Sequence, residues 1–196
     1  MEALFGKKKR KSGGALVLYT TRHGSTQRYA ERIAEPLDAL VKDAAYMSAD
    51  KAKTYDAIVL GCCVYEGKIR GLDLFAEHAK DLADKRLVIF TCGIYDPEEP
   101  DVRAELDGQI RSALGDAAEA VAVFHLRGAV RWRSLGVLEH VKMKKWIASI
   151  RGMEEGARSV AQAQLLETEG GTMDFTDEAD IRPIVHAARF GKETER

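Results

Sequence analysis

The chain alternates short, continuous apolar runs with longer stretches of helical periodicity, and this alternation limits the folds open to it. The clear apolar runs cover residues 15–19, 55–61, 86–91 and 120–124. They are apolar at successive positions, as the strands of a parallel sheet are when helices cover both of its faces. Parallel strands need crossover connections, which are usually helices. The pattern therefore predicts an α/β fold with a parallel sheet and helices on both faces.

The remaining segments supply the helices and one more strand. Residues 26–41 carry apolar residues every three or four positions, which predicts a helix that Pro36 should kink or end early. Residues 44–47 are a weak candidate for an edge strand. Further helices are predicted over residues 72–82, from Pro97 and Pro100 to Leu114, over residues 135–150, and from Thr176-Asp177 to Phe190. Five strands suit the doubly wound fold of strand order 2-1-3-4-5.

A doubly wound sheet restricts where a ligand can bind. Ligands lie beyond the carboxyl ends of the strands, at the point where the strand order reverses. This rule selects three loops, which follow the first, third and fourth strands and cover residues 20–26, 62–71 and 92–99. We expect the functional site among these loops.

Length and composition fit one globular domain. The 196 residues are 45% hydrophobic and 31% charged, and the formal net charge of -1 indicates no particular partner. We expect a domain over residues 15–190, a disordered basic arm over residues 1–14 and a short tail over residues 191–196. The arm contains five consecutive Lys or Arg residues at positions 7–11. Binding of nucleic acid or anionic lipid is the alternative interpretation of this arm.

Three features bear on the cellular compartment. No apolar run approaches the roughly 18 residues of a membrane-spanning helix. No apolar segment of a secretory signal follows the basic run. The three cysteines, Cys62, Cys63 and Cys92, have no metal-ligand spacing and indicate reduced thiols. We therefore expect a cytoplasmic protein without a metal site.

The most specific motif follows the first predicted strand. The loop of residues 21–26, Thr-Arg-His-Gly-Ser-Thr, leads directly into the first predicted helix. A helix N-terminus leaves backbone N–H groups unpaired and carries partial positive charge, so it attracts phosphate. The hydroxyl groups of Thr21, Ser25 and Thr26 add donors, and Gly24 lets the backbone approach the ligand closely. The loop therefore predicts a phosphate-binding site.

Residues 17–26 resemble the motif with which the flavodoxin family holds the phosphate of FMN. The form Thr-Arg-x-Gly-x-Thr is most similar to the flavodoxin-fold, quinone-dependent protoporphyrinogen oxidases and their relatives. Residues 61–67, residues 127–133 with the helix after them, and residues 175–177 also resemble segments of that family. The resemblance implies a flavodoxin-like fold, FMN as the cofactor, and the flavin itself as the group that carries the chemistry.

The resemblance and the topology together assign the FMN contacts to three loops. The predicted cofactor-binding residues are Thr21, Arg22, His23, Gly24, Ser25 and Thr26, then Cys63, Val64, Tyr65, Glu66 and Gly67, then Gly93, Ile94, Tyr95 and Asp96. Tyr65 and Tyr95 would flank the isoalloxazine ring, with packing in the core or at the rim as the alternative.

Some residues of these loops depart from the pattern of that oxidase family. Cys62, Cys63 and Glu66 stand where the family carries other small and basic residues, and the loop of residues 92–99 is acidic. These departures leave the substrate open and do not affect the flavin prediction. We interpret the cysteines as buried small residues near the cofactor and not as catalytic thiols.

Residues 127–151 form a basic segment. A single acidic residue, Glu139, stands against seven cations, which are Arg127, Arg131, Arg133, Lys142, Lys144, Lys145 and Arg151. Apolar residues are interleaved with them, so one interpretation is a core helix with a solvated basic face. The other is a surface that docks on a membrane, on an acidic substrate or on a redox partner. No nucleic-acid recognition motif accompanies the charge.

The sequence therefore favours an FMN-dependent oxidoreductase. The resemblance implies protoporphyrinogen, or a compound like it, as substrate and a quinone as acceptor, which would bring the protein to the membrane periphery. The alternative is a flavodoxin-type electron carrier without a substrate of its own, although the near-neutral charge argues against it. A phosphorylated receiver module would need acidic residues after the first strand and an Asp after the third, and both are missing. A flavodoxin-like module without flavin is the last alternative.

Overall fold

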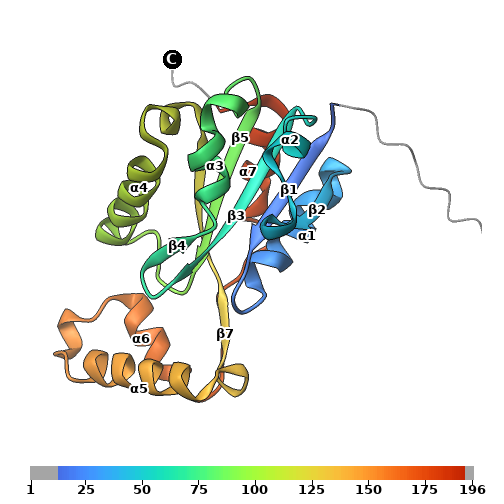
Figure 1. Cartoon of the computed structure of the whole chain (residues 1–196). Helices are drawn as coiled ribbons and strands as arrows, with labels where there is room; N and C mark the ends of the chain where they lie inside the picture. Colours follow the sequence, from blue (N-terminus) through green and yellow to red (C-terminus); the bar gives the residue numbers. More distant parts are fainter. Residues whose placement is uncertain (1–12, 193–196) are drawn as a thin grey trace, which may run out of the picture.

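The central sheet is built as the apolar runs predict. The computed structural model describes residues 13–192, and its main sheet has five parallel strands in the order β2-β1-β3-β5-β6 (Figure 1). The bounds of these strands are β1 (Ala15–Thr20), β2 (Leu40–Asp43), β3 (Ala57–Tyr65), β5 (Arg86–Gly93) and β6 (Ala122–Arg127). Counted among themselves along the chain, they follow the order 2-1-3-4-5. The predicted fold class is therefore confirmed.

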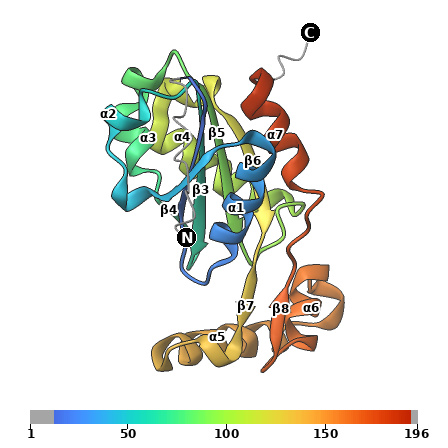
Figure 2. The same cartoon turned by 90° about the vertical axis from the view of Figure 1, so that its right-hand side faces the viewer.

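Helices cover both faces of this sheet (Figures 1 and 2). One face carries α1 (Ser25–Leu37) and α7 (Ile181–Phe190), and the other carries α2 (Ala49–Ala52), α3 (Asp73–His78) and α4 (Pro100–Leu114). The short helices of the main domain are η1 (Ala44–Tyr46), η2 (Ala79–Leu82) and η3 (Gly115–Ala120).

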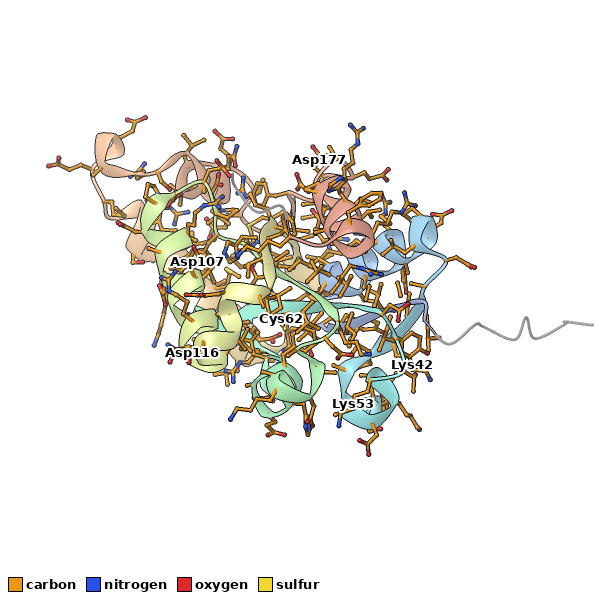
Figure 3. All side chains as sticks on the ribbon, turned by 90° about the horizontal axis from the view of Figure 1, so that it is seen from above. Lys42, Lys53, Cys62, Asp107, Asp116 and Asp177 are labelled. Carbon is orange, nitrogen blue, oxygen red and sulfur yellow. The ribbon has the colours of Figure 1, made fainter. Side chains whose placement is uncertain are left out.

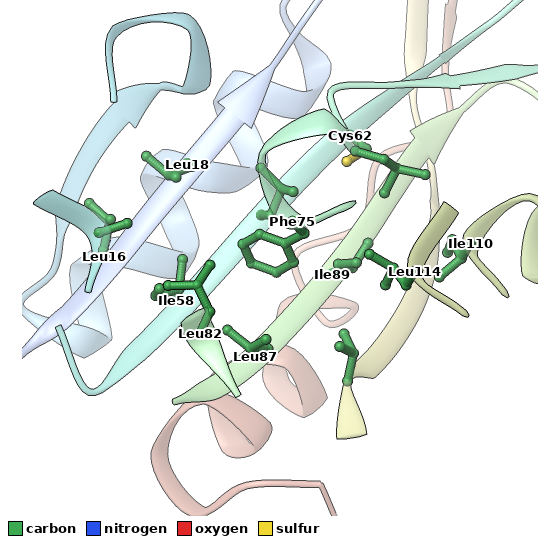
Figure 4. Packing of buried hydrophobic residues seen from close by; sticks show 14 of the residues in the cluster. Leu16, Leu18, Ile58, Cys62, Phe75, Leu82, Leu87, Ile89, Ile110 and Leu114 are labelled. Carbon is green, nitrogen blue, oxygen red and sulfur yellow. The ribbon is translucent and has the colours of Figure 1, made fainter. Parts of the chain in front are cut away.

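The two hydrophobic cores explain why the strands are apolar at every position. Leu16 and Leu18 of β1 point to one face and join the cluster that contains Phe75 of α3 (Figure 4). Val17, between them, points to the other face and packs in the cluster that contains Ile33 of α1. Successive side chains of a strand alternate between the faces, so a sheet covered on both sides needs a continuous apolar run.

The segment after β3 forms a hairpin and not an open loop. β4 (Lys68–Arg70) pairs with β3 in antiparallel fashion, and Tyr65 lies opposite Lys68. The two residues between them, Glu66 and Gly67, have φ values of 51° and 72°. Two consecutive positive φ values are the geometry of a tight two-residue hairpin turn. The turn therefore holds residues 63–67 in a defined position beside the end of the sheet.

The edge strand lies earlier than the sequence predicts. Helix α1 ends at Leu37, where Asp38 has a φ of 46° and its N–H bonds the carbonyl of Glu35. Leu40 and Val41, assigned to the helix by periodicity, belong to β2 and pair with β1. The prediction of a strand at residues 44–47 is wrong, because residues 44–46 form η1. Pro36 weakens the last turn, and the ladder to β1 supplies hydrogen bonds that a longer helix would not.

The last helix also begins later than predicted. Asp180 precedes the first residue of α7, Ile181. The predicted cap residue Asp177 instead accepts a hydrogen bond from the N–H of Ala179 at 2.8 Å. Its own N–H bonds the hydroxyl oxygen of Tyr29 at 3.0 Å. Asp177 therefore shapes the turn before α7 and ties that turn to α1.

Between β6 and α7 the chain forms a small separate unit, residues 128–176, which we call the accessory module. Its elements are β7 (Ala129–Arg131), η4 (Trp132–Ser134), α5 (Val137–Arg151), η5 (Glu155–Ala157), α6 (Val160–Glu167) and β8 (Thr172–Asp174). β7 and β8 form an antiparallel pair, and Trp132, Ile147 and Leu165 are buried in a core of their own. Figures 1 and 2 show this module beyond the carboxyl ends of the parallel strands. It therefore faces the end of the sheet where the ligand loops lie.

Two expectations about the chain ends fall largely outside the structure. The predicted arm of residues 1–14 and the tail of residues 191–196 lie mostly beyond the described range of 13–192. None of the helices within that range has the length and apolar character to cross a bilayer.

Gly61 gives a test of the packing in the core on the α1 side. A Cβ atom at this position would lie 2.3 Å from Cζ of the buried Phe90 ring. We expect Gly61→Ala to lower the free energy of unfolding by about 1–3 kcal/mol, because a packed core resists an added methyl group. Gly108→Ala in α4 is the control, since its Cβ would meet no atom within 4 Å. Urea unfolding followed by circular dichroism should show Gly108→Ala unchanged or stabilised by up to about 1 kcal/mol. Equal stability of the two variants would contradict the packing described.

Candidate functional site

A pocket lies where the three predicted loops meet the accessory module. Eleven of the fifteen predicted site residues line it, which are Arg22, His23, Ser25, Thr26, Cys63, Val64, Tyr65, Glu66, Gly93, Ile94 and Tyr95. The loops after β1, β3 and β5 form one wall, and α5 forms the opposite wall. The topology therefore brings these residues together, as the position of the switch point predicts.

The other four predicted residues shape the loops from behind the lining. The hydroxyl oxygen of Thr21 accepts a hydrogen bond from the N–H of Gly24 at 3.0 Å. The carbonyl of Gly67 accepts one from the side-chain amide of Gln109 at 2.7 Å. Asp96 accepts one from the N–H of Glu98 at 3.0 Å, which closes the turn after β5. Their predicted contact with a cofactor stays a prediction.

Sequence reasoning missed the wall that the accessory module supplies. Apart from Cys92 of β5, the missed lining residues belong to this module, and they are Gly128, Ala129, Val130, Leu135, Glu139, Lys142, Met143 and Trp146. On α5 the spacing of residues 139, 142, 143 and 146 marks one face of a helix. This spacing is the signal in the sequence that could have identified the wall.

The N-terminus of α1 forms one end of the pocket, where the sequence predicts the phosphate site. Gly24 is its cap residue with a φ of 89°, and no side chain caps the helix. The N–H of Gly24 bonds the hydroxyl oxygen of Thr21, and the first N–H that bonds a carbonyl within the helix is that of Arg28, which bonds Gly24 at 3.0 Å. Within residues 13–192 the N–H groups of His23, Ser25 and Thr26 have no protein acceptor. Unpaired amides and the positive end of the helix dipole together form a site for an anion.

The opposite end of the pocket is apolar and aromatic. Tyr95 and Trp146 meet edge to face, with ring centroids 5.3 Å apart. Ile94, Leu135 and Met143 line the same region. A ligand that is anionic at one end and flat and apolar at the other would match both ends.

Two ion pairs join α5 to the loops. Glu139 accepts hydrogen bonds from Nε and Nη2 of Arg22 at 2.9 Å and 2.7 Å, and from the hydroxyl of Tyr65 at 3.3 Å. Lys142, one turn further along α5, bonds Glu66 of the β3–β4 turn at 2.5 Å. The Arg22 guanidinium also lies 5.1 Å from the centre of the Tyr65 ring. We call these contacts the α5 latch.

Glu139 is the most strongly perturbed acid of the latch. The N–H of Gly136 bonds its carboxylate at 3.0 Å, and this bond together with Arg22 lowers the pKa of Glu139 to about 2. His23, beside it in the pocket, has a pKa below its usual value, because burial disfavours the charged ring. The latch is therefore ionised at neutral pH, whereas the neutral form of His23 is favoured.

The three cysteines lie in the C-terminal halves of β3 and β5, with Cys62 and Cys63 on β3 and Cys92 on β5. Cys63 and Cys92 are register partners on the two strands, and both line the pocket. Burial raises the pKa of Cys92 to about 11, although the nearby hydroxyls of Ser25 and Thr26 act to lower it. Burial also raises the pKa of Cys63 and of Cys62, which lies in the interior (Figure 3). All three are free thiols, and their raised pKa values agree with a packing role.

Fold and pocket define a class of protein. A doubly wound α/β domain with an open helix N-terminus at the switch point, beside an aromatic pocket, is typical of proteins that bind a phosphorylated planar ligand. A family model of the flavodoxin domain matches residues 16–157, and the chain belongs to this family. The match ends inside the accessory module, before α6.

Solved structures with a similar fold include three flavoproteins. Oxidised flavodoxin 2 from Bacillus cereus is 20% identical, with 59% of this chain and 84% of that chain covered and a TM-score of 0.45. A protein described as a putative flavoprotein from Bacteroides uniformis is 18% identical, with 70% and 99% covered and a TM-score of 0.44. A point mutant of flavodoxin from Pseudomonas aeruginosa is 19% identical, with 69% and 94% covered and a TM-score of 0.41. The curated proteins contain no significant match to this chain.

The low pKa of Glu139 predicts how acid acts on the latch. An unfolded Glu has a pKa of about 4.3, so the bonds of the Glu139 carboxylate, from Gly136 and from Arg22, stabilise the fold fully above that pH, and this effect is lost as pH falls towards 2. We expect Glu139→Gln to be less stable than the wild type at pH 6 and to approach wild-type stability near pH 2. Urea unfolding across this pH range measures the difference. Glu77→Gln, at an exposed position of α3, controls for the loss of one carboxylate. A deficit that is independent of pH would contradict the ionic latch.

Proposed function

We propose that the protein binds FMN in this pocket and works as an FMN-dependent oxidoreductase. One observation carries the proposal: in a chain of the flavodoxin family, the uncapped N-terminus of α1 opens into a pocket with an aromatic far end. FMN is a phosphate ester of a flat, apolar ring system, so its two ends match the two ends of the pocket. When bound, the flavin supplies the capacity to accept and pass on a hydride or electrons.

The phosphate would be held by the start of α1. The N–H groups of His23, Ser25 and Thr26 would donate to it, and the hydroxyl groups of Ser25 and Thr26 would add donors. Arg22 forms an ion pair with Glu139, so the two side chains together bring no net charge to this end of the pocket. The binding of phosphate would therefore depend on backbone amides more than on side-chain charge.

The ring would lie between the loops and the accessory module. Tyr65 and Tyr95 come from the loops after β3 and β5, and Trp146 comes from α5. These aromatic groups would pack against the ring and exclude water from it. The tight turn at Glu66 and Gly67 would hold the edge of the ring at a fixed backbone position. The role of these residues would be to bind and orient the ring and to shield it from water.

A protoporphyrinogen-like compound is the substrate that we propose, with a quinone as the electron acceptor. The resemblance of residues 17–26 to the quinone-dependent oxidases motivates this choice, and two features of the site support it. The far end of the pocket is apolar, and Lys142 lies at the pocket wall, where a carboxylate of the substrate would compete with Glu66 for its ammonium group. The alternative is an electron carrier without its own substrate.

The phosphate site can be tested with Ser25→Asp. Asp is well tolerated in the first turn of a helix, so this variant should fold, but its charge would repel a phosphate. Purified wild-type protein should be yellow and bind FMN at least a hundredfold more tightly than riboflavin, or about 2.7 kcal/mol. Ser25→Asp should lose this preference.

Gln27→Glu is the matched control for that experiment. It changes charge by the same amount in the same turn of α1, at a residue that is not part of the pocket lining. Fluorescence titration with FMN and riboflavin measures both affinities. Wild-type FMN affinity in Ser25→Asp would refute the assignment of the phosphate site.

Turnover separates the enzyme from the electron carrier. We expect the FMN-loaded protein to oxidise protoporphyrinogen anaerobically when a soluble quinone is supplied, with porphyrin fluorescence as the readout. Lys142→Gln should raise KM more than it changes kcat, because it removes a charge that binds substrate. Rapid flavin reduction by a reductase together with no porphyrin formation would favour the carrier.

A further inference from the structure

The outer face of α5 exposes apolar side chains in a way that the fold does not need. Val137, Leu138 and Val141 are 86%, 67% and 46% exposed. A helix that only covers a core normally presents polar residues to solvent. The inner face of α5 already supplies its share of packing, because Ile147 and Ile150 are buried in the accessory module. The outer apolar group is therefore additional to the core.

The cations of residues 127–151 fall into two groups. Three have partners inside the molecule: Arg127 stacks on Phe175 and bonds Gln164, Lys142 pairs with Glu66, and Arg151 pairs with Glu169. The other four are exposed, and within residues 13–192 no carboxylate pairs with them; they are Arg131, Arg133, Lys144 and Lys145.

No exposed acid stands among these four cations, two of which, Lys144 and Lys145, belong to α5. Glu139 is the single acid between residues 128 and 153, and it is turned inwards to Arg22. Elsewhere in the main domain Arg28, Arg32 and Lys53 each pair with a carboxylate. Helical spacing puts Lys144 and Lys145 on the same face of α5 as Val137, Leu138 and Val141, and Arg131 and Arg133 lie shortly before this helix in the chain. We call these three apolar residues and four cations the α5 outer face.

The shape of this surface suits a lipid bilayer better than a folded partner. α5 lies at one extremity of the molecule in two perpendicular views, so its outer face is a convex ridge (Figures 1 and 2). A stable protein interface buries about 800 Å² on each partner and involves about 20–30 residues. An interfacial helix needs only an apolar face that enters the headgroup boundary and flanking Lys or Arg side chains. The α5 outer face has the apolar side chains and the flanking cations that an interfacial helix needs.

We propose that the α5 outer face docks the protein on the surface of a bilayer that contains anionic phospholipid. Val137, Leu138 and Val141 enter the boundary between headgroups and acyl chains, and the four unpaired cations lie among the lipid phosphates. The inner face of the same helix lines the pocket through Met143 and Trp146. Docking therefore places the pocket wall beside the lipid, where a lipid-soluble electron acceptor would be found. The docking itself does not rest on the binding of flavin.

Co-sedimentation of the full chain with lipid vesicles tests this docking. The two vesicle types are phosphatidylcholine alone and an equal mixture of phosphatidylcholine and phosphatidylglycerol. We expect binding to the anionic vesicles only, and weaker binding as salt is added. Leu138→Asp should lower the partition coefficient at least about tenfold, because it removes an inserted side chain. Lys144→Gln combined with Lys145→Gln should lower it about 25-fold, at about fivefold for each cation.

Two controls keep the outcome specific. Phe190→Asp changes an apolar residue that is 72% exposed at the opposite end of the molecule, and it should bind vesicles as the wild type does. Changing the Lys and Arg residues at positions 7–11 to Gln removes the other basic run of the sequence, and most binding should remain. Circular dichroism and the FMN titration show that each variant is folded.

Three results would overturn the proposal. The first is a wild-type protein that does not bind anionic vesicles at low salt. The second is vesicle binding that the change at positions 7–11 abolishes and Leu138→Asp leaves intact, which would assign it to the basic arm. The third is self-association of the wild type on gel filtration that Leu138→Asp abolishes, which would assign the face to a second copy of the chain. None of these results bears on the flavin assignment, which the spectrum and titration test separately.

Discussion

The unpaired amides at the start of α1 are the feature on which the site depends. β1 holds them in place, because its pairing with β2 and β3 puts the strand inside the sheet and fixes where the loop leaves it. Thr21 closes the turn through its bond to Gly24, and Gly24 supplies the left-handed backbone that lets the helix begin without a side-chain cap. An open helix N-terminus is costly unless an anion or water satisfies it. The geometry therefore leaves these donors open to an anion, as the proposed phosphate site requires.

The accessory module turns this open site into a pocket. It has its own core around Trp132 and Leu165, so its shape does not depend on a ligand. Its contact with the loops combines the ion pairs of Glu139 with Arg22 and of Lys142 with Glu66 with the aromatic contact of Trp146 with Tyr95. The same helix thus links a cofactor pocket on one side with an apolar, cationic surface on the other.

Sequence alone was sufficient for the fold class and the loops, because both rest on strong local patterns. The continuous apolar runs predict buried parallel strands, and the motif at residues 21–26 sits where the topology needs it. The sequence was insufficient where tertiary pairing decides between alternatives, as for Leu40 and Val41, which have helical spacing but pair with β1. The α5 wall was missed because its lining residues, at positions 139, 142, 143 and 146, mix charged with apolar side chains and so lack the uniform apolar character of a buried helix face. Arg22 and Glu139 are 117 positions apart in the sequence, and a contact between residues so far apart along the chain leaves no trace in local periodicity.

The most direct test of the central claim is an amide-resolved nuclear magnetic resonance titration of the protein with FMN and, separately, with inorganic phosphate. The account predicts that the N–H signals of His23, Ser25 and Thr26 shift strongly with both ligands, since phosphate alone should occupy the start of α1. Signals from Tyr65, Tyr95 and Trp146 should respond to FMN only. Shifts that leave the amides at residues 23–26 unmoved while FMN binds elsewhere would contradict it.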